Sequence, residues 1–272
     1  MTRRVPAPEP APSGRVRLVV ANWKMHLTHL ETIAYLQQLW HLLEPDDYRR
    51  AEIVICPPFT ALRSAQLTID TDAMSFRLGA QDVYWEPEGA FTGEVSVPML
   101  AKLDVSYVIV GHSERRRLFG ESDEVVARKA SAVLGGGLAP IVCVGETSDE
   151  RASGDTGAVL ARQLDAVLEQ APARELDRMV IAYEPVWAIG SGTPANPEDA
   201  EDAAAQLRRR LAESAGDAVA ARVRILYGGS VDVGNAASFL GQVDVDGLLV
   251  GGASLDPQRF AQLVGAQAPS PS

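Results

Sequence analysis

Residues suited to acid–base chemistry directly follow short apolar runs of this sequence. They are Asn22 and Lys24 after the run at 16–21, His112 after the run at 105–110, and Glu184 after the run at 179–183. Brought together, a carboxylate supplies a base, an imidazole donates to a carbonyl oxygen, and an ammonium group supplies fixed positive charge. We therefore take Glu184, His112 and Lys24 as the candidate catalytic residues.

The residues after His112 have the composition of a helix start. Ser113-Glu114-Arg115-Arg116 would place a helix N-terminus at the imidazole, and the positive end of a helix dipole favours a neutral ring. A neutral imidazole donates a hydrogen bond without first losing charge. The alternative is a core histidine with no chemical role. We expect no metal, because no second His or Cys lies at ligand spacing from His112.

An apolar loop that contains glycines follows Glu184. Its residues are Pro185, Val186, Trp187, Ala188, Ile189, Gly190, Ser191 and Gly192. An apolar surface loop is unfavourable unless it closes over something, so this loop has the character of a lid. Closure would remove water from Glu184 and make its carboxylate a stronger base. The alternative is a carboxylate at a strand end that is paired with an arginine.

Positive charge and glycine-rich strand ends together predict a phosphate site. Lys24 would pair with Glu114 and also supply charge to an anion. Gly228-Gly229-Ser230 and Gly251-Gly252 follow two consecutive predicted strands, and glycines there let backbone N–H groups approach an anion.

One further glycine pattern is typical of a dinucleotide-binding site. Residues 190–195 match GxGxxA, but they follow a loop that contains Pro185 and Trp187 rather than a tight strand-to-helix turn. No strand after the next helix ends in an acidic residue that would bind a ribose. We therefore expect no nicotinamide cofactor, and an oxidoreductase is the weaker hypothesis.

The elements that carry these residues alternate between strands and helices. Consecutive apolar positions, typical of parallel strands buried on both faces, predict strands at 16–21, 52–56, 76–80, 105–110, 140–144, 179–183, 223–227 and 245–250. Helical spacing recurs between them, as at 30–43, 159–168 and 197–212, the last with Asn196 as its N-cap. Eight such units over about 240 residues predict one (β/α)8 barrel, with a doubly wound sheet as the alternative. The barrel is favoured because it brings every strand end to one rim.

Length and composition restrict the class of protein. The 272 residues carry a net charge of −11, which disfavours nucleic-acid binding. The apolar runs are far shorter than the about 20 residues of a membrane span, and Cys56 and Cys143 form no disulfide framework. Because no secretory signal is found, we expect a cytoplasmic protein. We expect one domain at 16–265, a disordered Pro-rich arm at 1–15 and a disordered tail at 266–272.

With these residues assembled, the chain resembles the triosephosphate isomerase family. The motifs that carry the resemblance are Ala21–Lys24, Gly79–Gln81, Gly89–Glu94, Gly111–Arg116, Ile141–Glu146, Ala182–Gly190, Leu226–Ser230 and Asp246–Gly252. The resemblance implies that dihydroxyacetone phosphate and glyceraldehyde 3-phosphate interconvert without a cofactor. It implies that Glu184 moves the proton and that His112 polarises the substrate oxygens. Lys24 and Asn22 would then stabilise the oxyanion.

The resemblance also implies supporting roles. Glu114 would position Lys24, and Ser113 would hold Glu184 while the lid is open. The phosphate would bind at Gly190, Ser230, Gly251 and Gly252. Tyr227 would latch the closed lid, and Ile189 and Leu249 would press on Glu184. The family is usually dimeric, so Trp85, Phe91 and Thr92 are expected in a homodimer interface.

The sequence departs from the family at two places. Thr193-Pro194 occupies the far end of the lid, where proline fixes φ and would alter lid kinetics. Trp85 leaves open an isomerase of a larger ketose phosphate, such as a tetrulose phosphate. A barrel that only binds a sugar phosphate is a third hypothesis, disfavoured because every catalytic position is occupied.

Overall fold

The computed structural model describes residues 5–11, 13–188 and 195–266. Within them eight parallel strands form a closed barrel in chain order, and β1 pairs with both β2 and β8. The strands are β1 (Leu18–Asn22), β2 (Glu52–Cys56), β3 (Arg77–Ala80), β4 (Val105–Val110), β5 (Ala139–Val144), β6 (Val180–Tyr183), β7 (Arg224–Tyr227) and β8 (Gly247–Val250). The prediction of a single (β/α)8 barrel is confirmed, and the doubly wound sheet is excluded.

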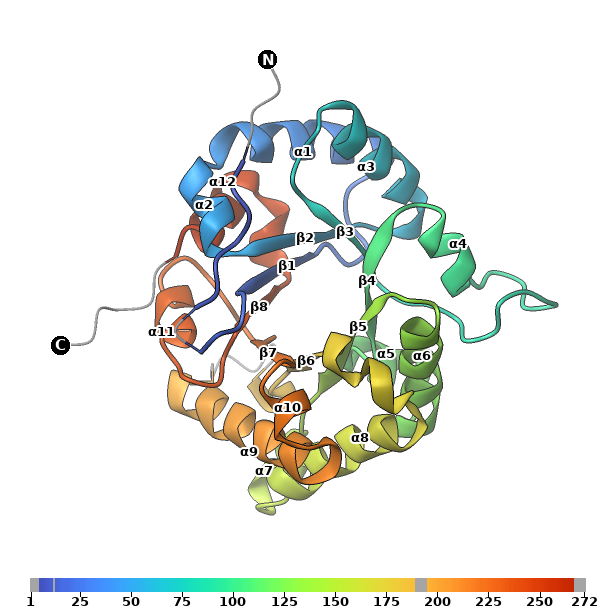
Figure 1. Ribbon diagram of the computed structural model, residues 1–272, viewed down its shortest axis with the longest axis vertical. Helices are drawn as coiled ribbons and strands as arrows, with labels where there is room; N and C mark the ends of the chain where they lie inside the picture. Colours follow the sequence, from blue (N-terminus) through green and yellow to red (C-terminus); the bar gives the residue numbers. More distant parts are fainter. Residues whose placement is uncertain (1–4, 12, 189–194, 267–272) are drawn as a thin grey trace.

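Helices surround the barrel on all sides (Figure 1). They are α1 (His29–Leu42), α2 (Pro45–Arg50), α3 (Phe59–Thr71), α4 (Val97–Ala101), α5 (Ser113–Phe119), α6 (Asp123–Gly135), α7 (Ser148–Ala152), α8 (Thr156–Gln170), α9 (Pro197–Ala215), α10 (Asp217–Ala220), α11 (Ala236–Leu240) and α12 (Pro257–Val264). Short 3-10 helices in the described part of the chain are η1 (Ala173–Arg178), η2 (Val186–Ala188) and η3 (Gly252–Leu255). No helix of the described ranges is long and apolar enough to cross a membrane.

Two apolar layers fill the molecule because the strands are buried on both faces. In β1, Leu18 and Val20 belong to a cluster made of strand residues only, which fills the barrel interior. Val19 and Ala21 belong to the larger cluster between the strands and the helices. This alternation is the reason why the strands are apolar at consecutive positions.

Element ends differ slightly from the sequence prediction. β2 and β4 have the predicted bounds, whereas β1 and β8 begin two residues later than predicted. The helix at 197–215 starts as predicted, because the Asn196 side chain accepts a hydrogen bond from the Asp199 N–H at 2.7 Å.

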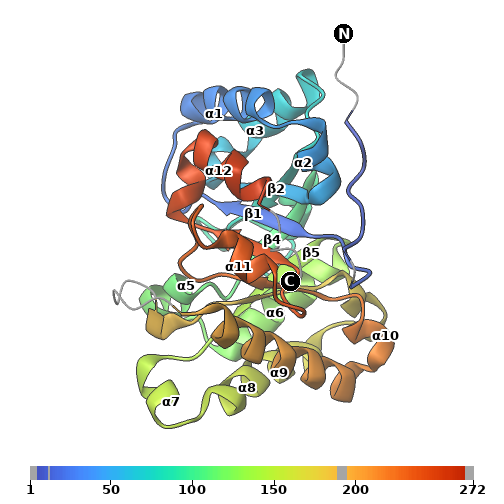
Figure 2. The same cartoon turned by 90° about the vertical axis from the view of Figure 1, so that its left-hand side faces the viewer.

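Residues 5–11 of the N-terminal arm contact the body of the barrel. The Glu9 N–H donates to the Arg49 carbonyl at 2.7 Å, and Arg15 Nε donates to Asp246 Oδ1 at 2.6 Å. Prolines restrict the backbone before folding, so fixing the arm in place costs less conformational entropy. The arm runs along the end of the barrel away from α5 and α7 (Figure 2). Residues 267–272 lie outside the described ranges.

Candidate active site

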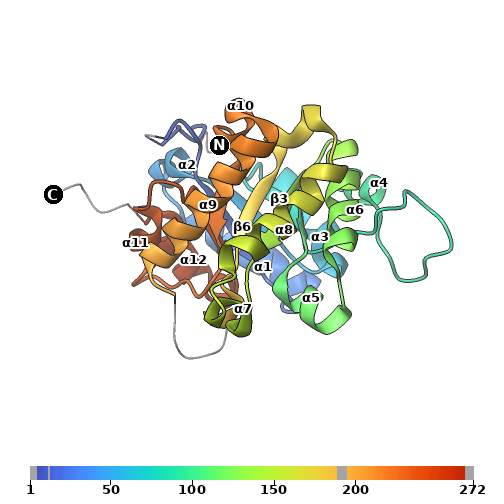
Figure 3. The ribbon, with the colours of Figure 1, turned by 90° about the horizontal axis from the view of Figure 1, so that it is seen from below.

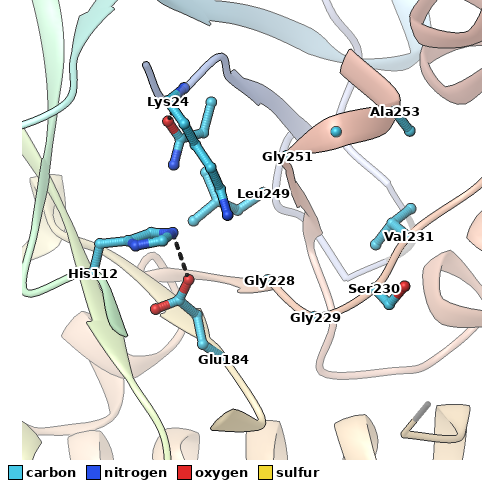
Figure 4. Close-up of a pocket in the computed structure, with 12 residues that line it drawn as sticks. Lys24, His112, Glu184, Gly228, Gly229, Ser230, Val231, Leu249, Gly251 and Ala253 are labelled. Carbon is cyan, nitrogen blue, oxygen red and sulfur yellow. Dashed lines mark hydrogen bonds and ion pairs between the residues drawn. The ribbon is translucent and has the colours of Figure 1, made fainter. Parts of the chain in front are cut away.

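A pocket of about 260 Å³ lies at the carboxyl ends of the strands. Its lining comes from the ends of β1, β4, β6, β7 and β8: Asn22, Lys24, His112, Glu184, Gly228, Gly229, Ser230, Val231, Leu249, Gly251, Gly252 and Ala253. The side chains of Lys24, His112 and Glu184 point toward one another across this pocket (Figure 4). Three groups from distant parts of the chain therefore meet in a space the size of a small metabolite.

Glu184, directly after β6, is held by two donors and is only 2% exposed. His112 Nε2 lies 3.0 Å from Glu184 Oε1, and the Ser113 N–H donates to Oε2 at 2.8 Å. The Glu184 backbone packs directly against Gly145, where there is no room for a side chain, because a Cβ on Gly145 would lie 1.8 Å from the Glu184 carbonyl oxygen. A Cβ on Gly228 would lie 3.0 Å from Glu184 Cγ. The carboxylate therefore occupies a dry, closely defined position.

His112 is the N-cap of α5. Its Nδ1 accepts a hydrogen bond from the Glu114 N–H at 3.2 Å, so Nδ1 carries no proton and the ring proton is on Nε2. A cationic ring would place an Nδ1–H against that backbone donor. The helix start predicted at Ser113 thus orients the imidazole so that Nε2 is directed into the pocket.

Lys24 is held in the left-handed region, with φ of +50°, which is costly for a residue with a Cβ. Asn22 Oδ1 accepts from the Lys24 N–H at 3.1 Å, and Gln81 Nε2 donates to the Lys24 carbonyl at 2.8 Å. Lys24 Nζ donates to Glu114 Oε1 at 2.6 Å. Burial alone would raise the pKa of Glu114, but the bond and charge of Lys24 lower it, so the ion pair persists.

The glycine-rich ends of β7 and β8 form a wall that lines the pocket from Glu184 to Lys24. Gly251 approaches Lys24 so closely that a Cβ there would lie 3.3 Å from Lys24 Cε. The short helix η3 begins at Gly252, and Ser230 and Leu249 complete this wall (Figure 4). Backbone N–H groups beside a lysine suit an anion.

The loop after Glu184 is anchored at its start. Trp187 Nε1 donates to Glu146 Oε1 at 2.8 Å, and the Tyr183 hydroxyl donates to the same oxygen at 3.1 Å. The Arg151 guanidinium lies 4.0 Å from the Trp187 ring centroid. Pro185, Val186 and Ala188 are described, whereas the predicted site residues Ile189, Gly190, Ser191 and Gly192, with Thr193-Pro194, lie outside the described residues.

Tyr227 is buried and stacks on Phe239 with ring centroids 3.9 Å apart. Burial raises the pKa of the phenol. Its hydroxyl has no hydrogen-bond partner among the described residues. The lid residues that it was expected to contact are outside them.

A buried ion network supports α5 from behind. Lys129 Nζ lies 2.6 Å from Asp82 Oδ1 and 2.5 Å from Glu121 Oε1, and Arg115 Nε lies 2.6 Å from Glu121 Oε1. Burial would raise the pKa of Glu121, but the bonds and charges of Lys129 and Arg115 lower it. The helix that carries Glu114 is thus fixed to the body of the protein.

Sequence reasoning missed two supporting residues. Gln81 and Glu146 stood inside motifs after strands, yet neither was assigned a role. A buried carboxylate such as Glu146, with 0% exposure, is unusual unless it holds a neighbour in place. Within the described residues no cluster of three His, Cys, Asp or Glu side chains could hold a metal ion.

Comparisons with known proteins agree with this geometry. The family model described as triosephosphate isomerase matches residues 17–267. A triosephosphate isomerase of Leifsonia xyli subsp. xyli is 49% identical over 252 residues, covering 92% of this chain and 96% of that protein. One from Saccharopolyspora erythraea is 48% identical, covering 95% of this chain and 99% of that protein. One from Streptomyces avermitilis is 46% identical, covering 92% of this chain and 97% of that protein.

Proposed function

Because the chain belongs to the triosephosphate isomerase family, it is an aldose–ketose isomerase, and we propose that Glu184, His112 and Lys24 carry its reaction. The enzyme interconverts dihydroxyacetone phosphate and D-glyceraldehyde 3-phosphate, a step of glycolysis and gluconeogenesis. The observation that carries the assignment of roles is the 3.0 Å approach of His112 Nε2 to Glu184 Oε1 inside the pocket.

Glu184 acts as the base. A carboxylate oxygen takes a proton from the substrate carbon beside the carbonyl, and the electron pair of that C–H bond forms the enediolate. The protonated carboxyl then returns the proton to the neighbouring carbon. The Ser113 N–H holds the carboxylate before substrate arrives, at 2.8 Å from Oε2.

His112 and Lys24 stabilise the charge that forms on the substrate oxygens. The Nε2–H of a neutral imidazole donates to the two oxygens in turn, since Nδ1 already accepts from the Glu114 N–H. Lys24 supplies positive charge and Asn22 orients its backbone. Glu114 keeps the ammonium group in place through the 2.6 Å contact to its Nζ.

The phosphate binds at the glycine-rich wall. Ser230, Gly251 and Gly252 line the pocket next to Lys24, and the proposal adds Gly190 from the lid. Binding of this non-reacting group would drive lid closure, which excludes water and protects the enediolate. Leu249, with Ile189, would press on Glu184 in the closed state, and Tyr227 would hold the lid.

A coupled isomerase assay tests these roles. Triose phosphates should turn over, and phosphoglycolate, which mimics the enediolate, should bind more tightly than substrate. An isomerase of larger ketose phosphates is not favoured, because the relatives are triosephosphate isomerases. Faster turnover of a tetrulose phosphate than of a triose phosphate would reverse this conclusion.

We also propose a homodimer in the cytoplasm, as in a soluble metabolic enzyme. The segment that contains Trp85, Phe91 and Thr92 projects from the body beyond α4 (Figure 3). Phe91 is 39% exposed, and Met25, next to Lys24, is 93% exposed, so a second subunit would cover apolar surface beside the pocket. Light scattering should give twice the chain mass of 29.1 kDa. An active species at the mass of one chain would refute the dimer.

A further inference from the structure

Two cavities meet at the amino end of the barrel, across the molecule from the active site. One, of about 240 Å³, is lined by Glu52, Arg77, Ser106, Tyr107 and Arg178, among others. The other, of about 440 Å³, lies between the N-terminal arm and the start of β3. Both are lined by Glu52 and Arg77, so the two spaces adjoin. The larger is within the roughly 300–1,000 Å³ of small-molecule sites.

The carboxylate between the two cavities is already paired. Arg224 Nη1 donates to Glu52 Oε2 at 2.8 Å, and the Tyr107 hydroxyl donates to the same oxygen at 2.9 Å. Arg224 Nη2 donates to the Tyr107 oxygen at 2.7 Å. Burial raises the pKa of Tyr107 to about 12, so the phenol remains a donor at neutral pH. Glu52 therefore adds little negative charge to the cavities.

Two further guanidinium groups line the smaller cavity. Arg77 is 62% exposed at its side chain, with Nε 3.4 Å from Glu52 Oε1. Arg178 is 47% exposed and pairs with Glu175 at 3.1 Å. The cavity lining thus contains two arginines, of which Arg178 is paired with Glu175, and one carboxylate, which is paired with Arg224, on a chain whose net charge is −11. Planar guanidinium groups favour phosphate over a simple halide.

The arm supplies an apolar wall to the larger cavity. Val5, Pro6 and Pro8 of the arm line it together with Met74 and Phe76. This wall exists because the arm is fixed by the hydrogen bond from Glu9 to the Arg49 carbonyl. An apolar ring fits such a wall, and prolines give it stiffness.

We propose that the amino end of the barrel is a second binding site, for a phosphate monoester that carries an apolar ring. Arg77 and Arg178 bind the phosphate, and the ring lies between the arm and the start of β3. The site is separate from catalysis, since it is formed by the opposite ends of the strands. The ligand therefore binds together with an active-site inhibitor rather than in competition with it.

Calorimetric titration with 1-naphthyl phosphate tests the site, on the full chain with its active site saturated by phosphoglycolate. We expect one molecule bound per chain. Arg77→Ala combined with Arg178→Ala should weaken binding at least about tenfold, because two charge-assisted contacts are lost. Arg222→Ala is the matched control, since Arg222 is 68% exposed and pairs with Asp177 outside both cavities.

Removal of residues 1–8 tests the ring-binding part of the proposed site apart from the phosphate-binding part, because it removes the arm and leaves both arginines. The truncated chain should lose affinity for 1-naphthyl phosphate but bind inorganic phosphate as the full chain does. Isomerase activity of each variant reports whether it has folded. Absence of binding beside phosphoglycolate, or equal affinity in the double arginine variant, would overturn the proposal.

Discussion

Shortening the base by one methylene tests how closely the structure defines its position. In Glu184→Asp the backbone of residue 184 cannot move toward the pocket to compensate. Its N–H donates to the Val144 carbonyl at 2.8 Å, and its carbonyl packs directly against Gly145. The carboxylate should therefore withdraw by about 1.5 Å, the length of one C–C bond. It would leave both His112 Nε2, now at 3.0 Å, and the Ser113 N–H, now at 2.8 Å.

A displacement of about 1 Å from the reacting geometry costs roughly 10²-fold in rate. We therefore expect kcat of Glu184→Asp to fall about 10²- to 10³-fold, equivalent to about 3–4 kcal/mol of barrier. KM and the affinity for phosphoglycolate should change less than about threefold, since the phosphate wall is unaltered.

The coupled assay and calorimetric titration of phosphoglycolate measure these quantities. Glu169→Asp, at an exposed position of α8, controls for the loss of a methylene and should behave as the parent chain does. If Glu184→Asp keeps more than a tenth of kcat, Glu184 is not the proton-transferring group. A parallel loss of phosphoglycolate binding would show that the pocket itself has changed.

Three other substitutions test the supporting structure. Lys24→Gln should lower kcat/KM by at least about 10²-fold and weaken its dependence on ionic strength, in assays at several salt concentrations. Glu121 has a lowered pKa in the folded state, so its pairing with Lys129 stabilises above about pH 4.5 and is lost as pH falls through the folded pKa. In urea unfolding at pH 7, Glu121→Gln should therefore lower the free energy of unfolding by about 1–3 kcal/mol, and the difference from the parent chain should be smaller below pH 4. An equal loss at both pH values would contradict the pairing. Gly145→Ala should lower both the melting temperature and kcat, because its Cβ would displace the Glu184 backbone; unchanged values would show that the close approach is tolerated.

The sequence predicted the barrel and the meeting of the candidate catalytic residues in one pocket for a physical reason. Strands buried on both faces are apolar at consecutive positions, so a polar residue such as His112 or Glu184 at a strand end stands out locally. In a closed parallel barrel those ends share one rim, so topology alone brings them together.

Contacts between residues that are far apart in the chain could not be predicted from the sequence around either residue. Glu146 lies 41 residues from Trp187, to which it is bonded, and nothing near either residue specifies the other. The arm was expected to be disordered because its composition is rich in proline. Its attachment depends on a carbonyl at Arg49 and a carboxylate at Asp246, neither of which a composition reveals.

The pairing of β1 with β8 has a consequence for synthesis of the protein in the cell. The ribosome makes Lys24 early and Gly252 near the end, and at about 5–20 residues per second the interval is roughly 10–50 s. During that time the edge of β1 that pairs with β8 stays open in the nascent chain, and an unpaired strand edge is prone to aggregation. Turnover of substrate starts after the last strand has been released, so a truncated translation product has no partial activity.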